Sequence, residues 1–484
     1  GVTVNQGGLV IGASSSGSGL LEAVTAGPLG IGTLTMATGT ALSSSGAFIV
    51  ANNVVFGADG SGEGTHYFNG TNSLTLNGVT TLPSVWNAVI ASPQMTVTIG
   101  DASLSQTTDT INKSGLGILT VGNYAGTITA VGGLVFSADG NGLSTRASQD
   151  LGGDVILSGD TAVTVNRSGS GPNARNKTLQ KAGLTNPGSI LSVANLNGFG
   201  LEFTGATVLN GASHFAVSTA SPSNAVPGLT LSGIVSDAGG YSLTKSGPGT
   251  LLLTNAANTF GGSGATIDVL AGVLAASSDG ALGASANSIT LNVDGSADVG
   301  FRATGSFATS RTFVLNQANN AIEVTAGNVL RLNTAFTRAN NTVNLTKNDN
   351  GVLELAAANT GWAGAVSVAG GSLRLSAANA LGSSTLSLNG PSSSAVQLSG
   401  GVTVSTALNM ASTSTGVNGT GGLLSVDGVN VYSGMITQQS GMAATIGALA
   451  GSTLTISGGI TTVNSTNFLP ASADAVINLS SVIT

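Results

Sequence analysis

A nine-residue pattern recurs three times in this chain and limits what it can fold into. In each copy a Lys is followed four residues later by Gly, six residues later by Leu and eight residues later by another aliphatic residue. The copies are KSGLGILTV at 113–121, KSGPGTLLL at 245–253 and KNDNGVLEL at 347–355. Each aliphatic run is too short to bury its own apolar face, so such units must stack on one another. The repeat therefore predicts a solenoid or an array.

The residues after each copy have the period of short β-strands separated by turns. Equivalent aliphatic residues recur after 15, 23 and 20 residues, from Leu119 to Leu134, Leu251 to Leu274 and Leu353 to Leu373. The Lys residues themselves are 132 and 102 residues apart, and a stacked coil tolerates such uneven spacing better than a string of sandwich domains does. We therefore predict an all-β chain: one continuous parallel β-helix over 1–484, with about 20 coils at ~20–25 residues each.

The repeat copies and one polar section divide the expected solenoid. Repeat units are expected around 113–136, 245–283 and 347–382. Between 137 and 187 the chain is richest in charge, with Arg146, Asp150, Asp154, Asp160, Arg167, Arg175, Lys177 and Lys181. This density predicts a polar, loop-bearing insertion at about 137–187.

The composition excludes several classes of function. Only 7% of the residues are charged and the net charge is −7, so there is no basic patch for nucleic acid. No run of ~18 apolar residues occurs, which argues against membrane insertion. The chain has no Cys, so disulfides, thiolate chemistry and Cys-based zinc sites are excluded.

Candidate reactive groups are few and scattered. His66 and His214 are the only histidines, and an exposed or turn position is expected for each rather than a catalytic one. Asp150, Asp154 and Asp160 form the one local acidic cluster, which would be the site of the alternative enzyme, a polysaccharide-cleaving β-helix. The glycine-rich turns around Asp59 and Asp139 could hold calcium, but ordinary turns are favoured. We predict no enzyme activity, no cofactor and no metal site.

The characteristic repeat residues have structural interpretations. The leading Lys of each copy is expected to neutralise a turn or contact a carbonyl. After each copy comes an Asn with an aromatic residue nearby. These aromatic residues are Tyr124, Phe260 and Trp362; they are expected to cap the core at a corner, with stacking on a sugar as the alternative.

Residues 243–260, LTKSGPGTLLLTNAANTF, followed by GVL at 272–274, resemble the autotransporter-associated β-strand repeat of bacterial surface proteins. Family members carry a Leu-Thr-Lys-x-Gly-x-Gly-Thr-Leu core, then Asn-Thr-aromatic and a Gly-Thr-Leu strand. The copy at 345–355 matches but has Asp349 in place of the first Gly. The resemblance implies a right-handed parallel β-helix outside the bacterial cell, in a family whose members act as stalks, adhesins and scaffolds.

The two ends of the chain suggest self-association. Residues 1–12 and 475–484 are strand-like and almost uncharged, and unpaired strand edges invite pairing with another chain. Either the chain is a fragment of a longer rod or identical subunits stack head to tail. The residues expected at such a contact are Val2, Val4, Leu9, Val476, Ile477, Leu479 and Val482. The functional hypothesis is a non-enzymatic structural or adhesive solenoid with identical subunits, and surface or host glycans, as partners; a monomeric adhesin passenger fragment and a polysaccharide-binding or -cleaving β-helix are the alternatives.

Overall fold

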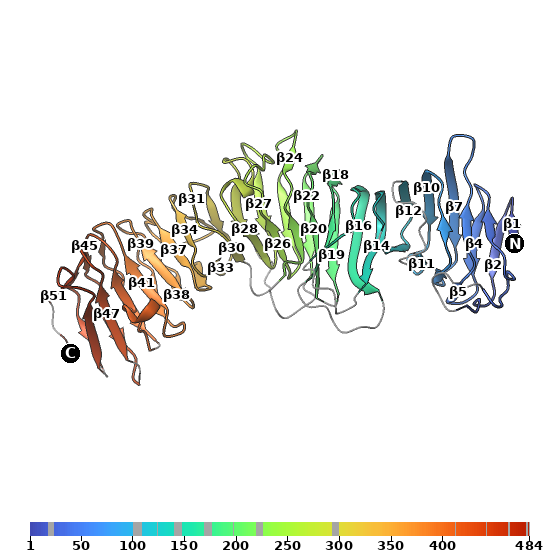
Figure 1. Ribbon diagram of the computed structural model, residues 1–484. Helices are drawn as coiled ribbons and strands as arrows, with labels where there is room; N and C mark the ends of the chain where they lie inside the picture. The colour runs from blue at the N-terminus through green and yellow to red at the C-terminus, as the bar shows by residue number, and fades with distance from the viewer. Residues whose placement is uncertain are drawn as a thin grey trace. The chain divides into compact units, whose positions relative to one another are not determined.

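The computed structural model describes residues 1–484 except 18–23, 100–108, 123, 140–147, 169–176, 197, 219–225, 293–299, 412, 442, 463–464, 481–482 and 484. Within the described part, all pairings between named strands are parallel. Helix there is limited to two short 3-10 turns, η1 (Gly280–Leu282) and η2 (Val417–Gly419). The chain is an all-β parallel β-solenoid (Figure 1), which confirms the predicted fold class.

The number of coils is smaller than predicted, about 17 instead of about 20. Leu345 pairs with Val366, 21 residues later. Leu408 pairs with Ile436, 28 residues later. Coils of the second kind have longer corners between short strands, so fewer of them fit into the same length of chain.

The chain forms two compact units, 1–252 and 253–484. In the first unit, strands of successive coils lie one above the other and form four columns. Neighbouring strands within a column are hydrogen-bonded to each other. The first column contains β1 (Val2–Val4), β3 (Leu34–Met36), β6 (Val54–Phe56) and β9 (Thr80–Thr81). The second contains β2 (Gly8–Ile11), β4 (Ala41–Ser44), β7 (Glu63–Asn69), β10 (Val85–Ile90), β12 (Thr110–Ser114), β14 (Thr127–Asp139), β16 (Val155–Ser168), β18 (Leu184–Asn186), β21 (Thr207–Leu209) and β24 (Val235–Asp237).

The third column contains β5 (Phe48–Val50), β8 (Leu74–Leu76), β11 (Thr96–Ile99), β13 (Ile118–Val121), β19 (Ile190–Asn195), β22 (Ser213–Val217) and β25 (Leu243–Ser246). The long strands β14 and β16 belong to both the second and the third column. The fourth column contains β15 (Ser148–Asp150), β17 (Lys177–Lys181), β20 (Phe199–Phe203), β23 (Leu229–Leu231) and β26 (Thr250–Leu253), which reaches the boundary of the unit.

The second unit is built in the same way. One column contains β27 (Thr266–Val269), β29 (Ser288–Leu291), β32 (Phe313–Leu315) and β35 (Thr337–Arg338). A second contains β28 (Val273–Ala276), β30 (Gly300–Ala303), β33 (Asn319–Val324), β36 (Asn344–Asn348), β38 (Ala365–Val368), β40 (Thr385–Leu388), β43 (Leu408–Met410), β46 (Ile436–Gln438) and β49 (Ile460–Thr461). A third contains β31 (Phe307–Thr309), β34 (Val329–Leu332), β37 (Val352–Leu355), β39 (Ser372–Leu375), β41 (Ala395–Leu398), β44 (Leu423–Ser425), β47 (Ala444–Ala448) and β50 (Thr466–Pro470). The last contains β42 (Thr403–Val404), β45 (Val429–Tyr432), β48 (Thr453–Ile456) and β51 (Val476–Leu479).

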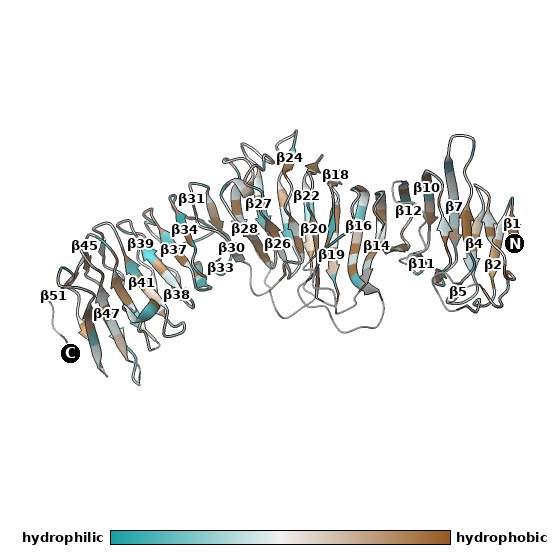
Figure 2. Ribbon diagram, in the orientation of Figure 1, coloured by the Kyte–Doolittle hydropathy of each residue, from teal (hydrophilic) through white to brown (hydrophobic). Residues whose placement is uncertain are grey.

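Side-chain alternation along each strand separates core from surface, because successive residues point to opposite faces. Leu353 of β37 pairs in register with Leu330 of β34 and with Leu373 of β39, and all three are buried. The next residues, Arg331, Glu354 and Arg374, form an outward row in the same register. Figure 2 shows this mixture of apolar and polar residues along the strands. The aliphatic recurrences from Leu119 to Leu134 and from Leu353 to Leu373 are thus in-register neighbours, as predicted.

The polar section at 137–187 contains the end of β14, then β15, β16, β17 and β18. The described parts of β16 pair with β14 on one side and with β18 and β19 on the other. The two ranges 140–147 and 169–176, which include Arg146 and Arg175, lie outside the described residues. The predicted boundaries of the insertion and of the repeat copies stay predictions.

Candidate functional site

The leading Lys of each repeat copy points into the solenoid and binds backbone carbonyls at a corner. Lys347 donates from Nζ to the carbonyls of Asn348 (2.5 Å), Asp349 (2.7 Å) and Gly370 (3.0 Å). Lys245 donates to Ser246 and Gly247, and Lys113 to Gly115 and Val131. All three side chains are buried. The predicted carbonyl contact is confirmed.

Burial also changes the acidity of these lysines. It lowers the pKa of Lys113 and of Lys347 to about 8, and that of Lys245 to about 7, because the charged ammonium loses its hydration. The carbonyl hydrogen bonds act in the opposite direction, since they favour the ammonium form. A fourth lysine, Lys181 in the polar section, is buried too; it donates to the carbonyl of Tyr124 (3.0 Å), and burial lowers its pKa to about 8.

The glycines of the repeat have two separate roles. The residue two positions after the Lys has a positive φ in all three copies: 79° at Gly115, 72° at Gly247 and 62° at Asp349. Glycine adopts this conformation without a steric penalty. The Gly four positions after the Lys lies against the preceding coil. A Cβ on Gly351 would come closer than 3.0 Å to the carbonyl oxygen of Thr325, and one on Gly249 to that of Ser218.

The aromatic residues of the repeat belong to the core. Tyr124, Phe260 and Trp362 are buried, so the predicted core position is confirmed and the alternative of stacking on a sugar is wrong. Trp362 Nε1 donates to the carbonyl of Val343 (2.7 Å), and the Tyr124 hydroxyl donates to the carbonyl of Asp109.

Neither histidine is placed as expected from the sequence. His66 lies in β7 and is buried: its Nε2 is 3.1 Å from the carbonyl oxygen of Met36, and its Nδ1 accepts from Trp86 Nε1 (3.2 Å). Burial lowers the pKa of His66. His214 lies in β22, half-buried, with Nε2 2.6 Å from Ser246 Oγ. An exposed or turn position is therefore wrong for His66, and His214 is a strand residue.

The three aspartates of the polar section each accept from a different backbone N–H group. Asp150 accepts from Gly152 (2.7 Å), Asp154 from Gly183 (2.8 Å) and Asp160 from Ile190 (2.8 Å). Asp59 likewise accepts from the N–H of Ser61 (2.8 Å) and closes an ordinary turn. Among the residues that the structure describes, no three His, Cys, Asp or Glu side chains gather as a metal would require; the side chain of Asp139 lies outside them.

Most of the residues predicted for self-association are in register with core residues of the neighbouring coil, and one of them lies on the outer face. Val2, Val4 and Leu9 pair in register with Leu34, Met36 and Leu42, which are fully buried one coil later, yet they themselves are half-buried. Ile477 and Leu479 pair with the buried Leu454 and Ile456, and Leu479 is 45% exposed. Val476 pairs with Thr453 on the outer face, so it does not extend the core. Val482 lies outside the described residues.

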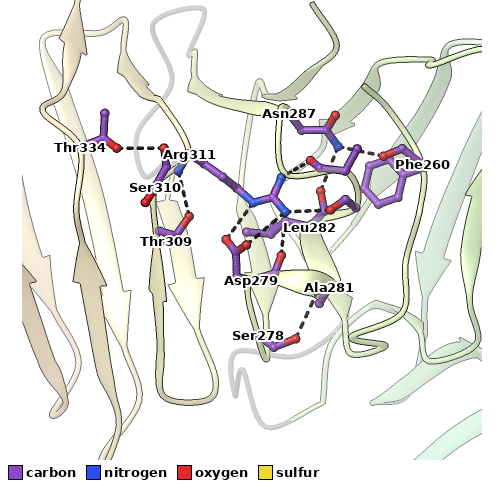
Figure 3. Close-up of polar contacts among 12 residues, drawn as sticks. Phe260, Ser278, Asp279, Ala281, Leu282, Asn287, Thr309, Ser310, Arg311 and Thr334 are labelled. Atoms are coloured by element: carbon purple, nitrogen blue, oxygen red, sulfur yellow. Dashed lines mark hydrogen bonds and ion pairs between the residues drawn. The ribbon is translucent and has the colours of Figure 1, made fainter. Parts of the chain in front are cut away.

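An arginine that the sequence does not single out joins neighbouring coils (Figure 3). The buried Arg311 binds the Asp279 carboxylate through Nε (2.9 Å) and the carbonyls of Asp279 (2.9 Å) and Gly283 (2.8 Å) through Nη2. Nη1 donates to the carbonyl of Ala284. Asp279 and Gly283 flank η1, so one guanidinium satisfies the carbonyls around this turn. These partners lie about 30 residues earlier in the chain, so no local pattern could have identified them.

A second charged group lies on the outer row of the second unit. Glu354 binds Arg331 on the coil before and, at 3.6 Å, Arg374 on the coil after, and Ser376 Oγ donates to it (2.7 Å). Glu354 is buried beneath the two arginines although it faces outward. The three residues are in register on β34, β37 and β39, so their charges form a ladder that links three consecutive coils.

Comparison with known proteins agrees with the repeat analysis. The passenger-associated-transport-repeat model matches residues 243–276 and 345–375. It does not cover 113–121, although the Lys113 corner makes the same kind of contacts. No curated protein and no solved structure matches this chain. In the described part of the chain no helix has the length and apolar character needed to span a bilayer. The repeat family suggests a secreted or cell-surface protein. The chain is a β-solenoid that carries two matches to the passenger-associated-transport-repeat, and this combination is consistent with an autotransporter passenger-like β-helix.

Proposed function

We propose that this chain is a non-enzymatic structural and adhesive solenoid on the outside of a bacterial cell, and that it self-associates head to tail through its terminal strands. One observation carries the proposal: the characteristic repeat residues are all used inside the solenoid. The Lys residues bind backbone carbonyls, the Leu residues fill the core, and the second glycines allow close contact between coils. The Lys, Leu and Gly positions that define the repeat thus support the stacking of one coil on the next.

The terminal strands support the self-associating part. In the described part of the chain, β1 pairs only with β3, and β51 pairs only with β48. The second edge of β1 and the second edge of β51 therefore have no partner strand among the described residues. Leu479 offers core-type apolar surface at one end, and Val2 and Leu9 offer it at the other. A second copy that continues the stack would cover both the edge and the apolar surface.

The proposal is tested by electron microscopy and light scattering of the purified 484-residue chain over a range of concentrations. Filaments that lengthen with concentration are expected, and Leu479→Asp should shorten them. Val429→Asp is the matched control, because Val429 is an exposed apolar residue of β45 in the same column as Leu479, away from the end. Single particles of one length at every concentration would contradict self-association.

Adhesion is the second part of the proposal, with a surface or host glycan as the expected partner. A surface rich in Ser, Thr and Asn and poor in charge supports recognition through neutral hydrogen bonds. A glycan array probed with the whole chain tests it: selective binding of a small set of glycans is expected. No binding would leave a purely structural role.

A further inference from the structure

An open groove of about 430 Å³ lies on the outer face of the first unit. Its apolar lining includes Leu116, Ile118, Gly133, Val135, Ala162 and Ile190. The groove runs across the strands. Its base is a row of residues that pair in register on β13, β14 and β16, namely Ile118, Gly133 and Ala162. Ala162 in turn pairs with Ser192 of β19. Small side chains along this row leave room, and the 65% exposed Leu116 forms part of a wall.

The extent of the groove across the coils favours an elongated occupant. Its lining extends from Pro93, before β11, to Ser192 in β19, which covers five successive coils. At the usual separation of paired strands this is a length of roughly 19 Å. An alkyl chain that lies across the coils matches this length and the apolar lining.

Charge selects the head group of that occupant. Of the groove-lining residues that the structure describes, Asp160 is the one that carries a charge. One of its oxygens is held by the N–H of Ile190 at 2.8 Å, which fixes the exposed carboxylate at the rim. The neighbouring His214, which pairs with Ile190 on the next coil, has its pKa lowered by burial and by Lys245, so it brings no positive charge at neutral pH. A cationic head group therefore complements this rim, and an anionic one does not.

We propose that this groove binds a free single-chain cationic amphiphile, with its alkyl chain along Gly133 and Ala162 and its ammonium group beside Asp160. Burial of apolar surface supplies most of the affinity, and the carboxylate selects the sign of the head group. The inference is independent of the proposed self-association, because the groove lies on the side of the solenoid and not at its ends.

Titration calorimetry with alkyltrimethylammonium ions of increasing chain length, kept below micelle formation, tests the proposal on the whole chain. Each added methylene should strengthen binding about fourfold until the chain fills the groove, after which the affinity should level off. Asp160→Asn should weaken binding about two- to fivefold, and alkyl carboxylates of equal length should bind more weakly than the cations.

Ala162→Leu should abolish binding by filling the groove, and it should leave the fold intact because Ala162 is exposed. Ser158→Leu is the matched control, since Ser158 is an exposed residue of the same strand outside the groove. Circular dichroism confirms folding of each variant. Equal loss in both variants, equal affinity for anionic chains, or binding only to phosphatidylcholine vesicles would overturn the proposal.

Discussion

Lys347 lies inside the solenoid with its ammonium group bound to three carbonyls, and this placement couples folding to pH. In the unfolded chain its pKa is near 10.5, and burial lowers it to about 8. Between these values the unfolded chain holds a proton that the folded chain has released. Raising the pH through this window therefore favours the folded state. Lys113, Lys181 and Lys245 act in the same direction.

We predict that resistance to urea rises between pH 7.5 and about 10. Above pH 10 it should fall again, because burial raises the pKa of Tyr124 and Tyr432, and the unfolded chain then loses tyrosine protons that the folded chain keeps. Fluorescence of the two buried tryptophans, Trp86 and Trp362, measures the urea midpoint. Lys347→Met should make the rise shallower, and a midpoint that declines steadily from pH 7.5 would contradict the prediction.

Asp349 occupies the corner position that is Gly in the other two copies, at a φ of 62°. Its carboxylate is 3.5 Å from Arg302 Nε, and both Asp349→Gly and Asp349→Ala remove this contact. The difference between the two variants therefore reports the cost of the left-handed conformation for Ala, less the stabilisation from the smaller entropy that Ala has in the unfolded chain. We predict that Asp349→Gly is more stable than Asp349→Ala by about 1 kcal/mol, measured from urea unfolding. Equal stability would show that the left-handed conformation is not maintained in solution.

At the scale of a single corner, the second repeat glycine sets the distance between coils. We predict that Gly351→Ala costs about 2 kcal/mol or more, because its Cβ would collide with the carbonyl of Thr325 in the coil before. Gly60→Ala is the control, since a Cβ there has no heavy atom within 4 Å and φ is not positive. Urea midpoints of the two variants give the comparison, and equal midpoints would refute the role assigned to this glycine.

Arg311 holds the turn around η1 through geometry as well as charge. Arg311→Lys keeps the charge but cannot reach the Asp279 carboxylate and the surrounding carbonyls together. We predict that it costs about 2–3 kcal/mol and speeds amide exchange in peptides covering 278–292. Arg331→Lys, at a 45% exposed ion pair, should cost less than about 1 kcal/mol. A similar cost at both sites would mean that the Arg311 network adds little.

Local patterns in the sequence predict the elements of this solenoid better than the contacts between them. The spacing of Lys, Gly and Leu indicates a corner between two strands. In the structure Lys113, Lys245 and Lys347 each lie near the end of one strand, and the Leu of the same copy lies in the next strand. The burial of His66 could also have been predicted, because it alternates with the other inward-facing residues of β7, Gly64 and Phe68. The partners of Arg311 could not be predicted, because they come from a turn one coil earlier. The predicted number of coils is slightly too high because the lengths of the corners follow no period.

For the whole molecule, parallel pairing means that each coil contacts mainly the coils before and after it, so a disturbance should decay over a few coils. Each unit carries one tryptophan, Trp86 in 1–252 and Trp362 in 253–484. We predict that Gly351→Ala lowers the urea midpoint reported by Trp362 and leaves that reported by Trp86 unchanged.

Trp362→Phe leaves Trp86 as the single fluorescent probe, and Trp86→Phe leaves Trp362. In each of these two backgrounds, the urea midpoint of the Gly351→Ala variant is compared with that of the chain that retains Gly351. Gly60→Ala in both backgrounds controls for a general effect of the added methyl group. If Gly351→Ala moves both transitions equally, the chain unfolds as a single cooperative body, and stability that adds up coil by coil is the wrong description of this solenoid.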